Sequence, residues 1–350
     1  MKKQKNIKKS HTNQLENIPE KKDKIKQTSL KFEKVESDNN FLKDFLILQH
    51  RPKPEKSRFS DFFEELKEQE KKNSIEEPKT EKTEENNQDI QDDKAPLKYV
   101  FQTVDDPSHY SHIFTKENFK TLEKWGLSQN MELVKFRFNT SFELKDLQRF
   151  LKDLFNDPVV KKNFPPLTLI ILPDDQKEIE NFKYKVLNTQ ATNMDLLDPI
   201  YENDIVTLDT GYIHQDYDNY VEDITISDKL RQALLMEESE PYGVFSQDQR
   251  DEFLFHIFKR IVIGGSLCQY EERIEPYLEM TKNFYKDIVS AAKDPESNKI
   301  YIRSVPVEIL SIEKSNLYKK KFHPQNFFYV VIDPYQRYVH LWYHNWVPFW

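Results

Sequence analysis

Glycine and cysteine are scarce in this chain, which has five glycines and one cysteine among 350 residues. A phosphate-binding loop or a dinucleotide-binding turn needs closely spaced glycines that open a helix. The adjacent pair Gly264 and Gly265 comes after a helical pattern and is followed by no lysine, so we expect neither kind of nucleotide site. The single cysteine, Cys268, excludes a disulfide within the chain and is typical of a protein from a reducing compartment.

Long apolar runs are also missing. No run approaches the ~20 residues that a helix needs to cross a bilayer. The basic residues at 1–11 are not followed by the apolar segment of a signal peptide. The formal net charge is −8, whereas proteins that read nucleic acid need a basic face. We therefore expect a cytoplasmic protein with no membrane partner and no nucleic-acid partner.

Aromatic residues are nearly absent from the first part of the chain. Residues 1–96 contain no Tyr, Trp, Gly or Cys, and they hold six of the 46 aromatic residues. Such a segment buries too little apolar area to offset a backbone ordering entropy of roughly 1–2 kcal/mol per residue. We therefore predict a disordered charged tail at 1–96 and a folded domain at 97–350.

Charge divides the predicted tail once more. Residues 1–58 carry a net charge of +8, residues 59–96 carry −7, and the predicted folded domain carries −9. A basic arm of this kind suits an acidic partner or the acidic surface of its own chain. A solvated linker without a partner is the alternative.

Hydrophobic periodicity in 97–350 predicts an α+β fold, with a helical middle and antiparallel strands in the C-terminal part. We expect strands at 97–104, 131–139, 167–172, 183–192 and 299–312, and two strands joined by a turn within 327–344. We expect helices at 115–126, 144–155, 195–202, 228–238, 247–263 and 276–292. Pro306 favours an edge position for the strand at 299–312, because proline cannot donate to a neighbouring strand.

Two serines are expected to cap helices of the middle region. Ser227 directly precedes the helix at 228–238, and serine at this position can accept a hydrogen bond from the first helical turn. Ser246 and Gln249 have the spacing of a capping box, which predicts the start of the next helix.

The segment between the last two predicted helices is expected to be a structural joint. Gly264 and Gly265 end one helix, and Pro276 suits the first turn of the next. Glycine alone accepts a positive φ without strain, so Gly265→Val should destabilise the fold if φ is positive there. Cys268→Ser should matter less, since one small side chain replaces another.

Residue types that carry catalysis or bind metals are not grouped at the required spacing. His340 and His344 lie four apart on a predicted strand, which separates them by about 13 Å and is too far for one ion. Cys268 is followed by Glu271 and Glu272, and acidic neighbours raise the pKa of a thiol. We expect no catalytic residue, no cofactor and no metal.

The last eleven residues are rich in aromatics and contain Trp342, Trp346 and Trp350. Chain ends are usually polar, so these side chains either pack into the core or anchor a partner, and both alternatives remain open. Tyr270 and Glu271, beside the glycine pair, are expected to be partly available. These five residues are the candidate partner-binding residues.

Three segments of the folded region are the most distinctive: "GGSLCQYE" at 264–271, "PYLEMTKNFYKDIVSAAKDP" at 276–295 and "FFYVVIDPYQRYVHLWYH" at 327–344. They resemble the cilia- and flagella-associated protein 300 family. Weaker similarity extends the match over roughly 131–344, with a poor match at 161–190 and none in the tail.

The resemblance implies a non-enzymatic protein of the cytoplasm and cilium. It implies a requirement for the assembly or intraflagellar transport of outer and inner axonemal dynein arms. The implied partners are a dynein-arm preassembly co-chaperone, axonemal dynein complexes and the intraflagellar transport machinery. Two alternatives remain, a structural subunit bound to axonemal doublets and an enzyme whose site is not recognised.

Overall fold

The computed structural model describes residues 98–104, 110–313, 317–318 and 322–347. All of them belong to one of the two compact units of the chain. The predicted tail at 1–96 lies outside the described residues. The described part contains helices and antiparallel sheets, which confirms the predicted α+β class.

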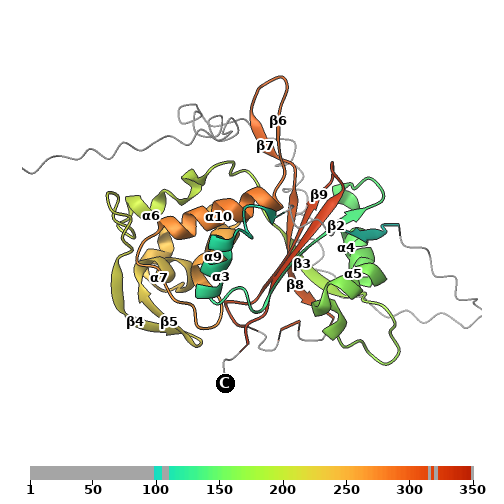
Figure 1. Cartoon of the computed structure of the whole chain (residues 1–350), viewed down its shortest axis with the longest axis horizontal. Helices are drawn as coiled ribbons and strands as arrows, with labels where there is room; N and C mark the ends of the chain where they lie inside the picture. The colour runs from blue at the N-terminus through green and yellow to red at the C-terminus, as the bar shows by residue number, and fades with distance from the viewer. Residues whose placement is uncertain (1–97, 105–109, 314–316, 319–321, 348–350) are drawn as a thin grey trace, which may run out of the picture. The chain divides into compact units, whose positions relative to one another are not determined.

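A six-stranded antiparallel sheet forms the centre of this unit (Figure 1). The strands follow the order β1-β2-β10-β9-β8-β3, so the last two strands of the chain lie in the middle. Their bounds are β1 Phe101–Thr103, β2 Met131–Phe138, β3 Phe182–Val186, β8 Val305–Ile312, β9 Phe327–Asp333 and β10 Tyr338–His344. The turn predicted within 327–344 joins β9 and β10, which pair from Tyr338↔Asp333 to His344↔Phe327.

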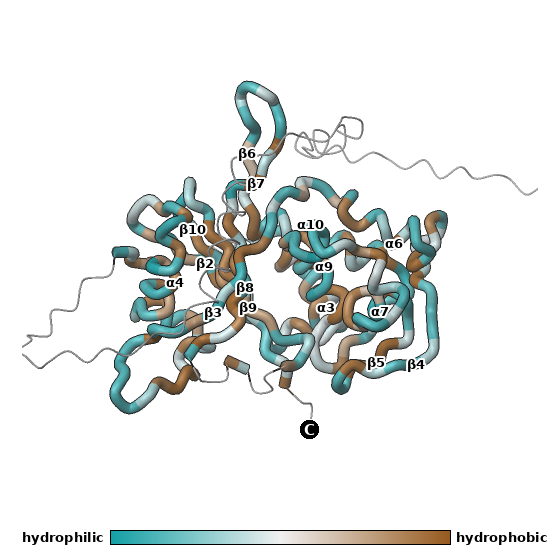
Figure 2. Tube along the Cα trace, turned by 180° about the vertical axis from the view of Figure 1, so that it is seen from behind, coloured by the Kyte–Doolittle hydropathy of each residue, from teal (hydrophilic) through white to brown (hydrophobic). Residues whose placement is uncertain are grey.

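Helices cover both faces of this sheet (Figure 1). One face packs on α4 Leu147–Asn156 and α5 Pro158–Asn163, and the other on the longer α9 Phe253–Ile263 and α10 Glu275–Ile288. All seven residues of β9 are buried, and the six from Phe327 to Ile332 enter the two cores alternately. This explains why β9 reads as a continuous apolar run, and Figure 2 shows the apolar residues concentrated in the central strands.

Further short elements complete the described part. The remaining α-helices are α3 Lys116–Lys124, α6 Pro199–Glu202, α7 Lys229–Leu235 and α8 Gln247–Arg250. Short 3-10 helices are η2 Leu144–Asp146, η3 Pro165–Leu169, η4 Met194–Leu197 and η5 Glu240–Val244. Two hairpins stand apart from the central sheet: β4 Gln215–Val221 with β5 Ile224–Asp228, and β6 Ala291–Lys293 with β7 Ile300–Ile302.

The strand predicted at 167–172 is wrong. This segment begins in η3, and its side chains at Leu169 and Ile171 are 73% and 79% exposed. Pro165 and Pro166 start η3 just before the segment, and their fixed φ and missing N–H groups favour a tight turn over strand pairing. The apolar run therefore does not enter the sheet.

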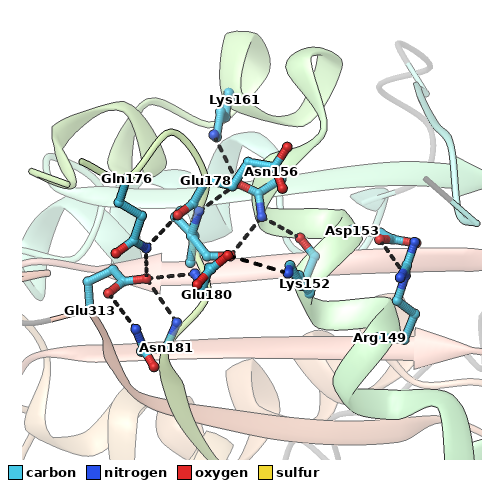
Figure 3. A network of polar contacts seen from close by, with 11 residues as sticks. Arg149, Lys152, Asp153, Asn156, Lys161, Gln176, Glu178, Glu180, Asn181 and Glu313 are labelled. Atoms are coloured by element: carbon cyan, nitrogen blue, oxygen red, sulfur yellow. Dashed lines mark hydrogen bonds and ion pairs between the residues drawn. The ribbon is translucent and has the colours of Figure 1, made fainter. Parts of the chain in front are cut away.

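Polar side chains hold the loop that follows η3 instead (Figure 3). Asn156 of α4 donates to the carbonyl oxygen of Ile179 and accepts from its N–H, both at 2.8 Å. The Glu313 carboxylate, after β8, accepts from the backbone N–H groups of Glu180 at 2.6 Å and Asn181 at 2.9 Å. These contacts fix the chain just before it enters β3.

Two helix ends differ from the prediction. Ser227 lies in β5, and the N-cap of α7 is Asp228, whose carboxylate accepts from the N–H of Arg231 at 2.8 Å. The helix predicted at 276–292 ends at Ile288, and the chain then enters β6.

The helix predicted at 247–263 is split into α8 and α9. The capping box of Ser246 and Gln249 is confirmed, but the helix breaks at Asp251 and Glu252. The break lies where the segment at 188–191 crosses, since Asn188 donates to the carbonyl oxygen of Asp251 and accepts from the N–H of Phe253. A backbone interaction with a distant segment thus replaces helical hydrogen bonds.

The edge position predicted from Pro306 is also wrong, because β8 lies between β9 and β3. Pro306 is the second residue of β8, and the pairing of β8 with β3 begins one residue later, at Val307. A proline near the start of a strand does not interrupt the ladder that follows.

Candidate partner-binding site

The predicted joint between α9 and α10 is a tight turn at 264–269, here called the glycine turn. Gly264 ends α9 with a φ of 67°, and its N–H donates to the carbonyl oxygen of Arg260 at 3.1 Å. Gly265 N–H donates to the carbonyl oxygen of Trp125 at 2.8 Å, and Gln269 N–H donates to that of Lys124 at 3.0 Å. The glycine turn is therefore fastened to the C-terminal end of α3.

Two glycines distant in sequence allow this close contact. Gly126, with a φ of 66°, follows α3 and touches the backbone of Gly265. A Cβ on Gly265 would overlap the carbonyl oxygen of Gly126 and lie 3.0 Å from Nε2 of His344. Gly265 itself has no positive φ, so the explanation proposed for its substitution is wrong, and close packing is the reason for glycine here.

Pro276 lies in the first turn of α10, as predicted. It borders a hollow of about 650 Å³ together with Tyr270, Glu271 and the C-terminal end of α3. The joint therefore brings both candidate residues that follow the glycine turn to one surface.

Tyr270 is half-buried and held on two sides. Its ring centroid lies 3.4 Å from the guanidinium carbon of Arg231, and its hydroxyl donates to the carbonyl oxygen of Thr225 at 3.2 Å. Arg231 is itself buried and makes an ion pair of 2.5 Å with Asp228 and a hydrogen bond of 2.7 Å to the Tyr277 hydroxyl. The Tyr270 ring thus has a fixed orientation.

Glu271 is tied to α3. Its Oε1 accepts from Lys124 Nζ at 2.7 Å and from Trp125 Nε1 at 2.9 Å, and its N–H donates to the Tyr277 hydroxyl at 2.8 Å. The side chain is 18% exposed. A partner could therefore reach its edge only, and binding by Glu271 stays a prediction.

The three tryptophans have different positions. Trp342 of β10 is fully buried and packs on Phe284 and Phe327, with ring centroids 4.8 and 4.6 Å away, so it presents no surface in this fold. Trp346 is half-buried and stacks on His323 at 4.3 Å. Trp350 lies outside the described residues.

Tyr270 and Trp346, 76 positions apart in the sequence, line the same pocket of about 330 Å³. The wall is completed by the glycine turn, by Asp223 and the first two residues of β5, and by Gln325. We call it the glycine-turn pocket. Two of the candidate partner-binding residues thus meet at one surface.

Cys268 faces this pocket. Burial raises the pKa of its thiol to about 12, although Arg231 acts in the opposite direction. The thiol is therefore protonated near neutral pH and is a poor nucleophile.

The two histidines of β10 are engaged separately. Nδ1 of His340 lies 3.0 Å from the Tyr110 hydroxyl, and Nδ1 of His344 lies 2.7 Å from the carbonyl oxygen of Gln325. Within the described ranges, no group of three or more His, Cys, Asp or Glu side chains could hold a metal ion. Over the same residues, no helix is both long and apolar enough to cross a membrane.

Comparison with known proteins gives the family. The family model of cilia- and flagella-associated protein 300 matches residues 98–344, which is most of the chain. The chain belongs to this family. A cilia- and flagella-associated protein 300 of Paramecium tetraurelia is 36% identical over 235 residues, which are 67% of this chain and 90% of the relative.

The corresponding protein of Chlamydomonas reinhardtii is 34% identical over 235 residues, which are 65% of this chain and 91% of that protein. No solved structure matches the chain. Membership in the cilia- and flagella-associated protein 300 family makes this a ciliary or flagellar protein, and the family is named for these organelles rather than for a reaction.

Sequence patterns missed the polar residues of the glycine-turn pocket. Asp223 lies in the two-residue turn between β4 and β5, where Glu222 has a φ of 56°. That hairpin lacks the Asn-Gly or Asp-Gly pair that marks such turns. Gln325 lies in the connection between β8 and β9, two residues before β9, where no periodicity exists to place it.

Proposed function

We propose that this member of the cilia- and flagella-associated protein 300 family is a non-enzymatic binding protein for the assembly or transport of outer and inner axonemal dynein arms. It acts in the cytoplasm and the cilium and needs no cofactor. Its partners are a dynein-arm preassembly co-chaperone, axonemal dynein complexes or the intraflagellar transport machinery. The observation that carries the proposal is family membership over residues 98–344.

The glycine-turn pocket supports a binding role. Aromatic side chains anchor protein interfaces well, and Tyr270 and Trp346 meet in this pocket. The polar groups beside them serve the fold, since the Tyr270 hydroxyl and the Glu271 carboxylate are both hydrogen-bonded within the chain. We therefore propose Tyr270 and Trp346 as the partner-binding residues of this pocket, and partner binding by Glu271 and Trp350 stays a prediction from the sequence.

Loss of the gene in a ciliated cell tests the role in dynein-arm assembly. Axonemes should form, but electron tomography should show fewer outer and inner arms, and the cilia should beat poorly. The wild-type gene should restore the arms, and Trp346→Leu should restore fewer than the control Tyr217→Leu. Tyr217 is 88% exposed and does not line the pocket. Normal arm density in the cells without the gene would overturn the proposal.

Extraction of isolated cilia separates a transport factor from a structural subunit. A transport factor should leave with the soluble matrix when the membrane is removed with detergent. Retention on the doublets through a salt wash would favour the structural subunit over the proposed role.

A further inference from the structure

The side-chain amide of Gln325, a residue that lines the glycine-turn pocket, leaves one acceptor unused. Its Nε2 donates to the carbonyl oxygens of Gly265 at 2.7 Å and Ile263 at 3.3 Å. The opposite orientation would place Oε1 against these two oxygens, so the amide is fixed as described. Gln325 is 4% exposed, and its Oε1 is buried and has no hydrogen-bond partner among the described residues.

A buried acceptor without a partner is unfavourable, and a ligand that brings an N–H group into the pocket removes this penalty. The ligand must therefore carry a hydrogen-bond donor. The donor must also be able to enter a space of about 330 Å³, which suits one side chain rather than a folded surface.

The walls of the pocket restrict the shape of that side chain. Tyr270 and Trp346 contribute aromatic rings, and Leu267, which is 59% exposed, adds an apolar side chain. A planar group on an apolar stem matches these walls, because guanidinium groups stack on aromatic faces. The Tyr270 ring already makes one such contact, since the buried Arg231 stacks on it.

Charge favours a cation as the donor. Residues 97–350 carry a net charge of −9. The wall of the pocket includes the carboxylate of Asp223, whose Oδ1 accepts from Nε2 of His323 at 2.8 Å. A positively charged donor is therefore attracted toward this surface.

We propose that the glycine-turn pocket takes the guanidinium group of an arginine presented by a partner protein, with Gln325 Oε1 as its acceptor and Tyr270 and Trp346 as its walls. The inference rests on the proposed partner-binding role of this surface. It concerns a chemical class of ligand, however, and its test does not depend on dynein arms.

Saturation-transfer NMR on the full chain tests the proposal with three small probes: the N-acetyl methylamides of arginine, lysine and norleucine. The arginine probe should bind, the lysine probe should bind more weakly, and the norleucine probe should give no signal. Trp346→Leu and Asp223→Asn should each weaken binding of the arginine probe by about two- to fivefold.

Matched controls keep this test specific. Tyr217→Leu removes an exposed aromatic ring, and Asp218→Asn removes an exposed charge of the same hairpin, and neither residue lines the pocket. Both controls should bind the arginine probe as the wild type does, and circular dichroism should show the same fold for all four variants.

Four results would overturn the proposal. Equal binding of the norleucine probe would show that the pocket recognises apolar stems only. Equal binding of the lysine probe would remove the requirement for a guanidinium group. Absence of arginine binding, or binding that the two pocket variants leave unchanged, would exclude this pocket as the site.

Discussion

Gly265→Ala is the sharpest test of the contact between the glycine turn and α3. The added Cβ would overlap the carbonyl oxygen of Gly126 and approach Nε2 of His344 to 3.0 Å. The overlapping atoms belong to the backbone, so two chain segments must move apart. Overpacking of this kind costs about 1–3 kcal/mol. Separation would also weaken the hydrogen bond of 2.8 Å from Gly265 N–H to the carbonyl oxygen of Trp125, which contributes about 1 kcal/mol.

We therefore expect Gly265→Ala to lower the free energy of unfolding by about 2–4 kcal/mol. For a unit of this size, the melting temperature should fall by about 5–15 °C. Differential scanning calorimetry and urea unfolding of the full chain measure both quantities.

Gly243→Ala is the matched control, because no atom lies within 4 Å of a Cβ built at Gly243 and its φ is not positive. It should leave the melting temperature nearly unchanged. If Gly265→Ala and Gly243→Ala melt together, the contact with Gly126 does not constrain the fold, and the steric argument is refuted.

Two further predictions concern buried ionisable groups. Arg231→Met should destabilise the unit by about 3–5 kcal/mol in urea unfolding, because Asp228 is left as a buried unpaired charge. The double variant Asp228→Asn/Arg231→Met should be more stable than Arg231→Met, and a less stable double variant would contradict this account. Burial lowers the pKa of His344 from 6.5 to about 4, so on acidification the unfolded chain takes up this proton at a higher pH than the folded chain does. The free energy of unfolding should therefore decrease as the pH falls from about 6.5 to about 4. The decrease in the free energy of unfolding should reach about 3 kcal/mol. Urea unfolding near pH 7 and near pH 4 should show a smaller decrease for His344→Asn than for the wild type. An equal decrease would mean that His344 is not the group responsible.

Much of the fold follows from local sequence patterns. The amphipathic repeat predicts α4, the two strands expected within 327–344 correspond to β9 and β10, and the capping box at Ser246 marks the start of α8. These signals are strong because each depends on neighbouring residues that share one face or one cap.

The errors arise where contacts with distant parts of the chain determine the local structure. The apolar run at 167–172 is compatible with a buried strand, but two prolines precede it and no strand within the described residues pairs with it, so it lies in a turn. The β4 strand was not predicted because its side chains are mostly exposed and polar, so no alternation marks it. Its pairing with β5 provides hydrogen bonds that a pattern of hydrophobicity does not record.

The candidate site was predictable in its residues but not in its geometry. The tyrosine, the glycines and the tryptophans could be named from the sequence. The pocket, however, combines the β4–β5 turn, the glycine turn and the segments at either end of the β9–β10 hairpin. Only the tertiary fold brings them together, and the same fold places Trp342 in the core and Trp346 at the surface.

The central position of β9 and β10 has a consequence for biosynthesis. The helices of both layers precede these strands in the sequence, so they leave the ribosome before the sheet on which they pack exists. Until then α9, whose side chains are mostly buried in the finished fold, can pack on α7 and α10 but lacks its contacts with β9 and β10. The nascent chain should therefore depend on chaperones until its final strands emerge. A premature stop anywhere before β9 would remove the two central strands, β9 and β10, on which both cores pack.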